Sequence, residues 1–319
     1  MLRYVFRRIL LIIPTLIGIT LIVQLFIIIT PGDPARLLLG TNVSEEEVDA
    51  MRHEMGLYDP FIVRYGNYVG GIIRGDFGKS YSTKRPVLTE ILVRFPYTVL
   101  LVFISMILAV AIGIPVGIYA ATHQYSWKDN FAIFASLFCV SMPGFWFALM
   151  LIQLFCVKLK ILPVAGVDNW MGWVLPAFTG ALGFAASVAR QMRSNLLEVI
   201  RQDYITTARA KGQAENTVLY RHALKNAIIP IIMTVGGIFG FALGGSLITE
   251  VIFSIPGLGN YTISALMSRD YPVIQTSVLF LSTLFCIILL LIDLAFALVD
   301  PRIRAQYSAR KKKDLKGAA

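Results

Sequence analysis

The sequence predicts an all-α integral membrane protein with six transmembrane helices, one helical cytoplasmic loop, and a small extracytoplasmic domain after the first helix. The first observation is composition: 56% of the residues are hydrophobic and 15% are charged, against about 25% charged in soluble domains. The second is a series of apolar runs, each near the length of about 17–25 residues that a membrane-spanning helix needs. These runs cover residues 9–30, 97–121, 130–157, 173–189, 227–252 and 274–299.

The first apolar run is predicted to be a membrane span and not a signal peptide. A signal peptide has an apolar core of only about 7–15 residues, followed by a cleavage site of small residues. Arg3, Arg7 and Arg8 precede the run at residues 9–30. Because basic residues are retained on the cytoplasmic side, they orient the N-terminus into the cytoplasm.

Residues 31–96 mix acidic and basic side chains in nearly equal number, which is compatible with export across the membrane. Ser44 followed by Glu47 forms a capping-box pattern at the start of a short helix. We expect a small ordered extracytoplasmic domain here.

The loops support this topology. The segment between spans four and five and the tail after span six are rich in Arg and Lys, whereas the predicted outer loops carry only Lys158, Lys160 and Arg269. Both termini are therefore expected in the cytoplasm. The predicted regions are 1–30, 31–96, 97–300 with a cytoplasmic loop at 190–226, and a basic tail at 301–319.

The most polar part of the membrane region is residues 203–230. Asp203 is a suitable N-cap for a helix over Tyr204–Lys211, and Gly212 is typical of the residue after a helix C-terminus. A second helical pattern starts near Ala214, and Pro230 fits the first turn of the next span. This pair of short helices could dock in a groove of another protein, or it could be an ordinary basic loop.

Small residues recur at four-residue spacing in spans two and five, at Gly113 and Gly117 and from Gly236 to Gly244. Such spacing lets helices approach closely, so packing is the default interpretation and a wall of a translocation pathway the alternative. Pro143 predicts a kink in span three. Gly244, Ser246 and Glu250, near the outer end of span five, are candidates for a pathway or gate.

The sequence shows no site for chemistry of its own. GDFGKS at 75–80 lacks the first glycine of a phosphate-binding loop, because that position is Ile73. The cysteines and histidines are dispersed, so neither a disulfide framework nor a metal site is expected, and no catalytic constellation or nucleic-acid face is visible. Glu250 and Asp293 are the carboxylates in the spans, where structural hydrogen bonding and a functional role are both open.

The loop motif resembles that of a known family. Thr206-Thr207-Ala208 with Gly212, Leu224 and Pro230 is similar to the loop of binding-protein-dependent ABC importer permeases, whose usual form begins Glu-Ala-Ala. His222 and Lys225 stand where isoleucine and proline are common in that family. Further stretches at 32–34, 55–87, 250–259, 269–275 and 300–304 resemble the peptide/nickel group, and above all the first permease subunit of dipeptide and oligopeptide importers.

The resemblance implies a transport subunit with no cofactor of its own. Its expected partners are a homologous second permease subunit, two ABC ATPase subunits that bind ATP and Mg, an extracytoplasmic solute-binding protein, and a peptide substrate. The residues expected to couple to the ATPase are Asp203, Tyr204, Ile205, Thr207, Ala208, Arg209, Lys211 and Gly212. We expect apolar seating of Tyr204, Ile205 and Ala208 to carry much of the affinity, because exposed ion pairs contribute only about 0.2–1 kcal/mol each.

Two alternatives remain from the sequence. A nickel or metal-chelate importer belongs to the same class, and a gene for a nickel-binding protein nearby would favour it. An ion-gradient-driven secondary transporter belongs to another class, although such carriers usually place more ionisable groups deep in the membrane. A membrane enzyme is disfavoured because no catalytic arrangement is visible.

Overall fold

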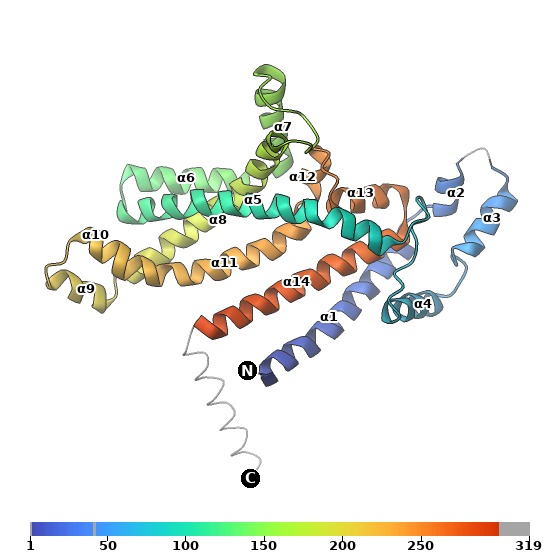
Figure 1. Cartoon of the computed structure of the whole chain (residues 1–319), viewed down its shortest axis with the longest axis horizontal. Coiled ribbons are helices and arrows are strands. Elements are labelled where there is room, and N and C mark those ends of the chain that lie inside the picture. The colour runs from blue at the N-terminus through green and yellow to red at the C-terminus, as the bar shows by residue number, and fades with distance from the viewer. Residues whose placement is uncertain (1, 41–42, 300–319) are drawn as a thin grey trace, which may run out of the picture.

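A computed structural model describes residues 2–40 and 43–299, and these residues form helices and no strand; the one β-bridge joins Lys79 and Pro86. The predicted tail at 301–319 and the motif at 300–304 lie outside the described residues. The helices, labelled in Figure 1, are α1 Leu2–Ile29, α2 Pro34–Leu39, α3 Glu45–Glu54, α4 Phe61–Ile73, α5 Val87–Thr122, α6 Trp127–Ser141, α7 Gly144–Leu151, α8 Val174–Ile200, α9 Asp203–Ala210, α10 Glu215–Thr217, α11 Leu224–Gly245, α12 Leu247–Ile252, α13 Leu258–Ser268 and α14 Tyr271–Val299.

Five of the predicted spans are helices long and apolar enough to cross a membrane, and the sixth is a bent pair. Helices α6 and α7, the latter extended by a π-helical turn to Lys158, meet at an angle of 98°. Pro143 lies at this break and Met142 before it is extended, because a residue that precedes proline avoids the helical conformation. The predicted kink is therefore confirmed, and it is sharper than expected because it interrupts the helix of span three completely.

The helices extend beyond the apolar runs. Helix α8 continues to Ile200, so the first part of the predicted loop at 190–226 is helical. The second predicted loop helix is not separate: α10, the π-helical turn Val218–Ala223 and α11 follow one another without a gap. Pro230 consequently lies inside α11 and not in its first turn, so that prediction was wrong. Proline is tolerated inside a membrane helix because neighbouring helices and local changes in the backbone satisfy the carbonyl group that proline leaves without its usual hydrogen bond.

Small residues allow a close contact between α5 and α8. A methyl group at Gly113 would lie 2.6 Å from the carbonyl oxygen of Ala185, and one at Gly117 would lie 2.5 Å from that of Ala189. The predicted packing role of this glycine pair is confirmed. In α11, a methyl group at Gly240 would lie 3.1 Å from the ring of Phe285 of α14, a less close contact made with a side chain.

The two polar ends of the molecule lie far apart (Figure 1). Helices α9 and α10 lie at one end, and α2, α3 and α4 lie at the other, beyond the start of α5. Helices α1 and α14 run side by side below the other spans. The predicted capping box that opens α3 is confirmed, because Ser44 accepts from the backbone of Glu47 and the Glu47 carboxylate accepts from the backbone of Ser44.

Candidate functional site

Helix α9 is short and ends where the sequence indicates. Gly212 adopts a φ of +75°, which glycine reaches without strain, and the helix stops at Ala210 before it. Asp203 is the first helical residue, whereas Gln202 occupies the N-cap without a side-chain hydrogen bond, so the predicted cap was wrong. A carboxylate in the first turn still favours the helix through the helix dipole.

One side of α9 is inserted into the chain's own core. Ile205 and Ala208 are buried in a cluster with Leu196 of α8 and with Val218 and Ala223 of the π-helical turn. They are therefore occupied within this chain and are not free to seat in a partner. This corrects the expectation that both residues would supply apolar contacts outside the molecule.

The other side of α9 is exposed. Tyr204 is 44% exposed and its hydroxyl accepts a hydrogen bond from Asn226 Nδ2 at 2.8 Å. The remaining exposed predicted residues of this loop are Asp203, Thr207, Arg209, Lys211 and Gly212. The structure thus gathers these residues on one polar surface at the end of the molecule.

A bidentate ion pair braces the turn at Gly212. Arg209 donates from Nε to Glu215 at 3.1 Å and from a terminal nitrogen at 2.6 Å. The hydrogen bond to Glu215 raises the pKa of Arg209 above its ordinary value. Because Arg209 already has a partner, its exposed pair adds rigidity across the turn, with a contribution to stability of about 0.2–1 kcal/mol.

A buried ion pair between α6 and α8 was missed by the sequence analysis. Asp129 at the start of α6 accepts from Arg193 of α8 at 2.6 and 2.7 Å and from the backbone of Tyr125 at 3.0 Å. Asp129 is almost fully buried. The pair joins the turn between α5 and α6 to the helix that leads into α9. The signal in the sequence was the helix N-cap Ser126 followed by Asp129 in the first turn.

At the opposite end, Glu250 is enclosed by its own loop. Its carboxylate accepts from Ser246 Oγ at 3.1 Å and from the backbone of Asn260 at 3.0 Å, and it is fully buried. A Cβ atom at Gly257 would overlap the carboxylate, and one at Gly259 would lie 2.8 Å from it. The loop after α12 therefore closes around Glu250, and a pathway role for Glu250 stays a prediction.

A second buried carboxylate holds the outer segments together. Asp270, just before α14, accepts from Ser80 Oγ at 2.6 Å and from the backbones of Tyr81 and Ser82 at 3.0 and 3.1 Å. The GDFGKS stretch thus ends in a tether to Asp270, and α5 begins only at Val87. A phosphate-binding loop would instead lead directly into a helix N-terminus.

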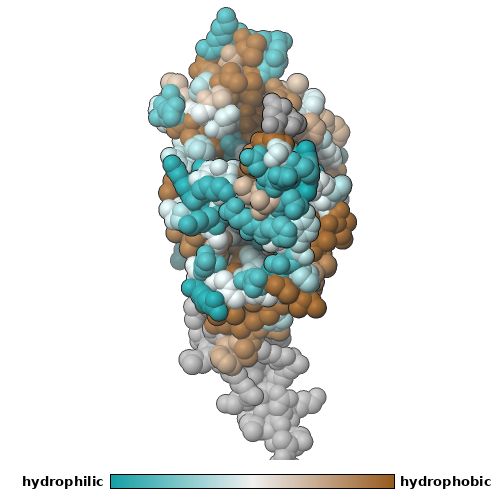
Figure 2. Space-filling view, turned by 90° about the vertical axis from the view of Figure 1, so that its right-hand side faces the viewer, coloured by the Kyte–Doolittle hydropathy of each residue, from teal (hydrophilic) through white to brown (hydrophobic). Residues whose placement is uncertain are grey.

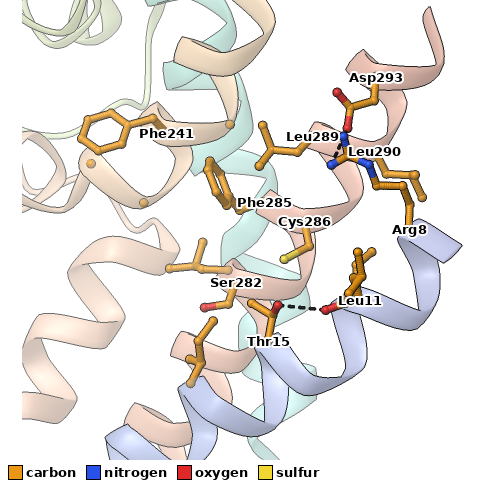
Figure 3. Close-up of a pocket in the computed structure, with 16 residues that line it drawn as sticks. Arg8, Leu11, Thr15, Phe241, Ser282, Phe285, Cys286, Leu289, Leu290 and Asp293 are labelled. Carbon is orange, nitrogen blue, oxygen red and sulfur yellow. Dashed lines mark hydrogen bonds and ion pairs between the residues drawn. The ribbon is translucent and has the colours of Figure 1, made fainter. Parts of the chain in front are cut away.

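Two cavities adjoin the candidate pathway residues. The larger, of about 620 Å³, lies between α1, α11 and α14 and has a mostly apolar wall that includes Gly244 (Figure 3). Asp293 forms an ion pair with Arg8 of α1 at 2.9 Å at one end of it. Asp293 is therefore in a structural ion pair between two spans.

The second cavity, of about 470 Å³, lies beside the break in span three and includes Ser246 in its wall. Ser105 of α5 and Thr179 of α8 also line it, and both hydroxyls are buried without a hydrogen-bond partner. Gly244 and Ser246, which were predicted to line a pathway, thus each lie in the wall of a cavity. Their role in a pathway stays a prediction.

Comparison with known proteins gives the following findings. A family model described as the binding-protein-dependent transport system inner membrane component matches residues 113–305, and a model of the N-terminal part of such components matches residues 1–102. The chain is 40% identical over 304 residues to the glutathione transport system permease protein GsiC of Escherichia coli (strain K12) and to that of Salmonella typhimurium (strain LT2), covering 95% of this chain and 99% of each relative. A crystal structure of an amino acid ABC transporter with histidines is more distant, with a TM-score of 0.49 and 19% identity over 67% of this chain and 94% of that one.

Proposed function

Because this chain belongs to the family of binding-protein-dependent transport system inner membrane components, it is a multi-pass permease subunit of an ABC importer, and we propose that its cargo is a short peptide. The relatives at 40% identity carry the name of a glutathione transporter, and glutathione is itself a small peptide. The similarity extends over both the N-terminal and the main membrane region, which supports a shared type of cargo.

We propose that the subunit works in an assembly. Its partners are a homologous second permease, two ATPase subunits that hold ATP and Mg, and an extracytoplasmic binding protein that delivers the peptide. Both termini face the cytoplasm of a prokaryotic cell. The polar surface of α9 then faces the ATPases, and α2 to α4 face the outside.

One observation carries the proposed coupling mechanism: α9 has one exposed polar face and one face buried among spans. Ile205 and Ala208 pack in the same cluster as residues of α8 and α11. A helix seated in this way cannot shift without moving the spans it contacts, because packed interiors resist deformation. ATP-driven closure of the partner subunits would therefore move α8 and α11 together and change access to the pathway.

The test is purification of the tagged chain from native membranes in mild detergent, followed by reconstitution into proteoliposomes. We expect two ATPase subunits and a second permease to copurify, identified by mass, and ATP-driven uptake of labelled tripeptide when the binding protein is added. ATP-driven uptake of nickel without peptide uptake would show that the cargo is nickel and not a peptide. Transport that survives loss of the ATPases and is abolished by an ionophore would overturn the importer mechanism.

A further inference from the structure

Helix α4 presents a bare apolar face. Ile62 is 80% exposed and Ile73 is 81% exposed on the same side, and Arg64 is the one charged residue of this 13-residue helix. Methyl groups at Gly66 and Gly70, which lie on that side, would meet no atom within 4 Å. Nothing in the described chain covers this face.

The depth of α4 follows from one contact with span one. Tyr65 donates its hydroxyl proton to the carbonyl oxygen of Ile17 at 3.1 Å and lies 3.1 Å from Thr20 Oγ1. Thr20 precedes Ile29, the end of α1, by nine residues, which is about 14 Å of helix. Because Tyr65 reaches these groups with its side chain alone, α4 lies against the outer part of span one, next to the interface in which interfacial helices lie at a depth of about 5–10 Å.

The charged side of α4 faces away from the bare side. Arg64 lies close enough to Tyr81 to act on its pKa; burial raises that pKa to about 12, and Arg64 opposes the rise. By helical spacing, Arg64 lies about 200° around the helix from Ile62, whereas Ile62 and Ile73 share the exposed side.

The span that α4 contacts is itself largely uncovered within the described chain. Most residues of the apolar stretch Arg8–Ile29 in α1 are not buried within the chain, and Phe26 is 67% exposed. Figure 2, which views this end of the molecule, shows a hydrophilic patch with hydrophobic surface beside and below it. The acid-rich helix α3 also lies at this end of the molecule, and its Glu46 is exposed. Helix α3 thus exposes charged side chains where α4 exposes isoleucines.

We propose that α4 is an interfacial helix whose Ile62–Ile73 face inserts into the outer leaflet of the bilayer, with lipid acyl chains as its partner. The segment after span one is then divided between two environments: α3 stands in water, and α4 lies in the membrane surface. Inserted in this way, α4 is held against span one by Tyr65.

The experiment places a nitroxide label at single cysteines in the assembled transporter in nanodiscs, with Cys139, Cys156 and Cys286 replaced by alanine. The labelled variants are Ile62→Cys and Ile73→Cys, with Phe26→Cys as the lipid-facing reference and Glu46→Cys as the water-facing reference. Collision of the label with oxygen, which concentrates in lipid, is compared with collision with a water-soluble nickel chelate.

We expect the ratio of oxygen to nickel collisions at positions 62 and 73 to resemble that at 26 and to exceed that at 46 several-fold. A ratio like that at 46 would overturn the proposal, because the face would then stand in water. Protection of both labels from both reagents would also overturn it, because a protein partner would then cover the face. The readout does not depend on transport, so it stands apart from the test of the proposed function.

Discussion

Replacing Gly117 by alanine tests how closely spans two and four approach. The new methyl group would lie 2.5 Å from the carbonyl oxygen of Ala189 and 2.6 Å from Cβ of Met192, both on α8. Neither atom can rotate away, because one belongs to the backbone and the other is fixed to it. The helices themselves would have to separate.

Two opposing effects decide the magnitude. Alanine is favoured over glycine inside a helix by about 0.5–1 kcal/mol, whereas insertion of a methyl group into a packed interface costs about 1–3 kcal/mol. We expect Gly117→Ala to lower the free energy of unfolding by about 1–2 kcal/mol. Gly237→Ala in α11 is the matched control, because no atom lies within 4 Å of its added methyl group. That variant should be neutral or more stable by up to about 1 kcal/mol.

The assay is thermal unfolding of the purified protein in one detergent, with wild type and both variants compared. For a chain of 319 residues, a loss of 1–2 kcal/mol corresponds to a fall in Tm of about 1.5–3 °C, because the unfolding entropy is about 2.1 cal/mol/K per residue. If Gly117→Ala melts at or above the temperature of Gly237→Ala, the close approach of α5 and α8 is refuted.

Three further predictions concern the two ends of the molecule. Gly212→Val places a β-branched residue at a φ of +75°, at a cost of about 1–3 kcal/mol of strain. Uptake should fall while membrane insertion persists, and Gly212→Asn should retain more uptake. Equal uptake by both variants would contradict the strain argument. Asp129→Ala leaves Arg193 without its bidentate partner and should lower stability by about 3 kcal/mol, while addition of Arg193→Ala should recover part of that loss in a double-mutant cycle; simple additivity would contradict the pairing. Asp270→Ala removes the acceptor of three hydrogen bonds and should speed hydrogen exchange at Tyr81 and Ser82 relative to α5, so unchanged exchange there would contradict the tether.

Local features explain why much of the fold could be predicted. A bilayer demands about 20 apolar residues per helix, and the turn at Gly212 and the capping box at Ser44 depend on residues adjacent in sequence. The predictions that failed at Asp203 and Pro230 concern helix ends. At Asp203 the helix starts one residue earlier than predicted. At Pro230 the continuous run of α10, the π-helical turn and α11 moved the helix start by several residues.

The sequence by itself indicated which apolar segments are long enough to span a membrane and where the helical loop lies, because each depends on hydrophobic length or backbone preference within one segment. The sidedness suggested by Arg and Lys stays a prediction. The tertiary structure alone decided which groups meet. Asp129 and Arg193 are 64 residues apart, and Asp270 and Ser80 are 190 apart. It also decided that Ile205 faces inward and that α4 leaves an apolar side uncovered. A residue pattern fixes which face of a helix is apolar, but what covers that face depends on how all the helices pack.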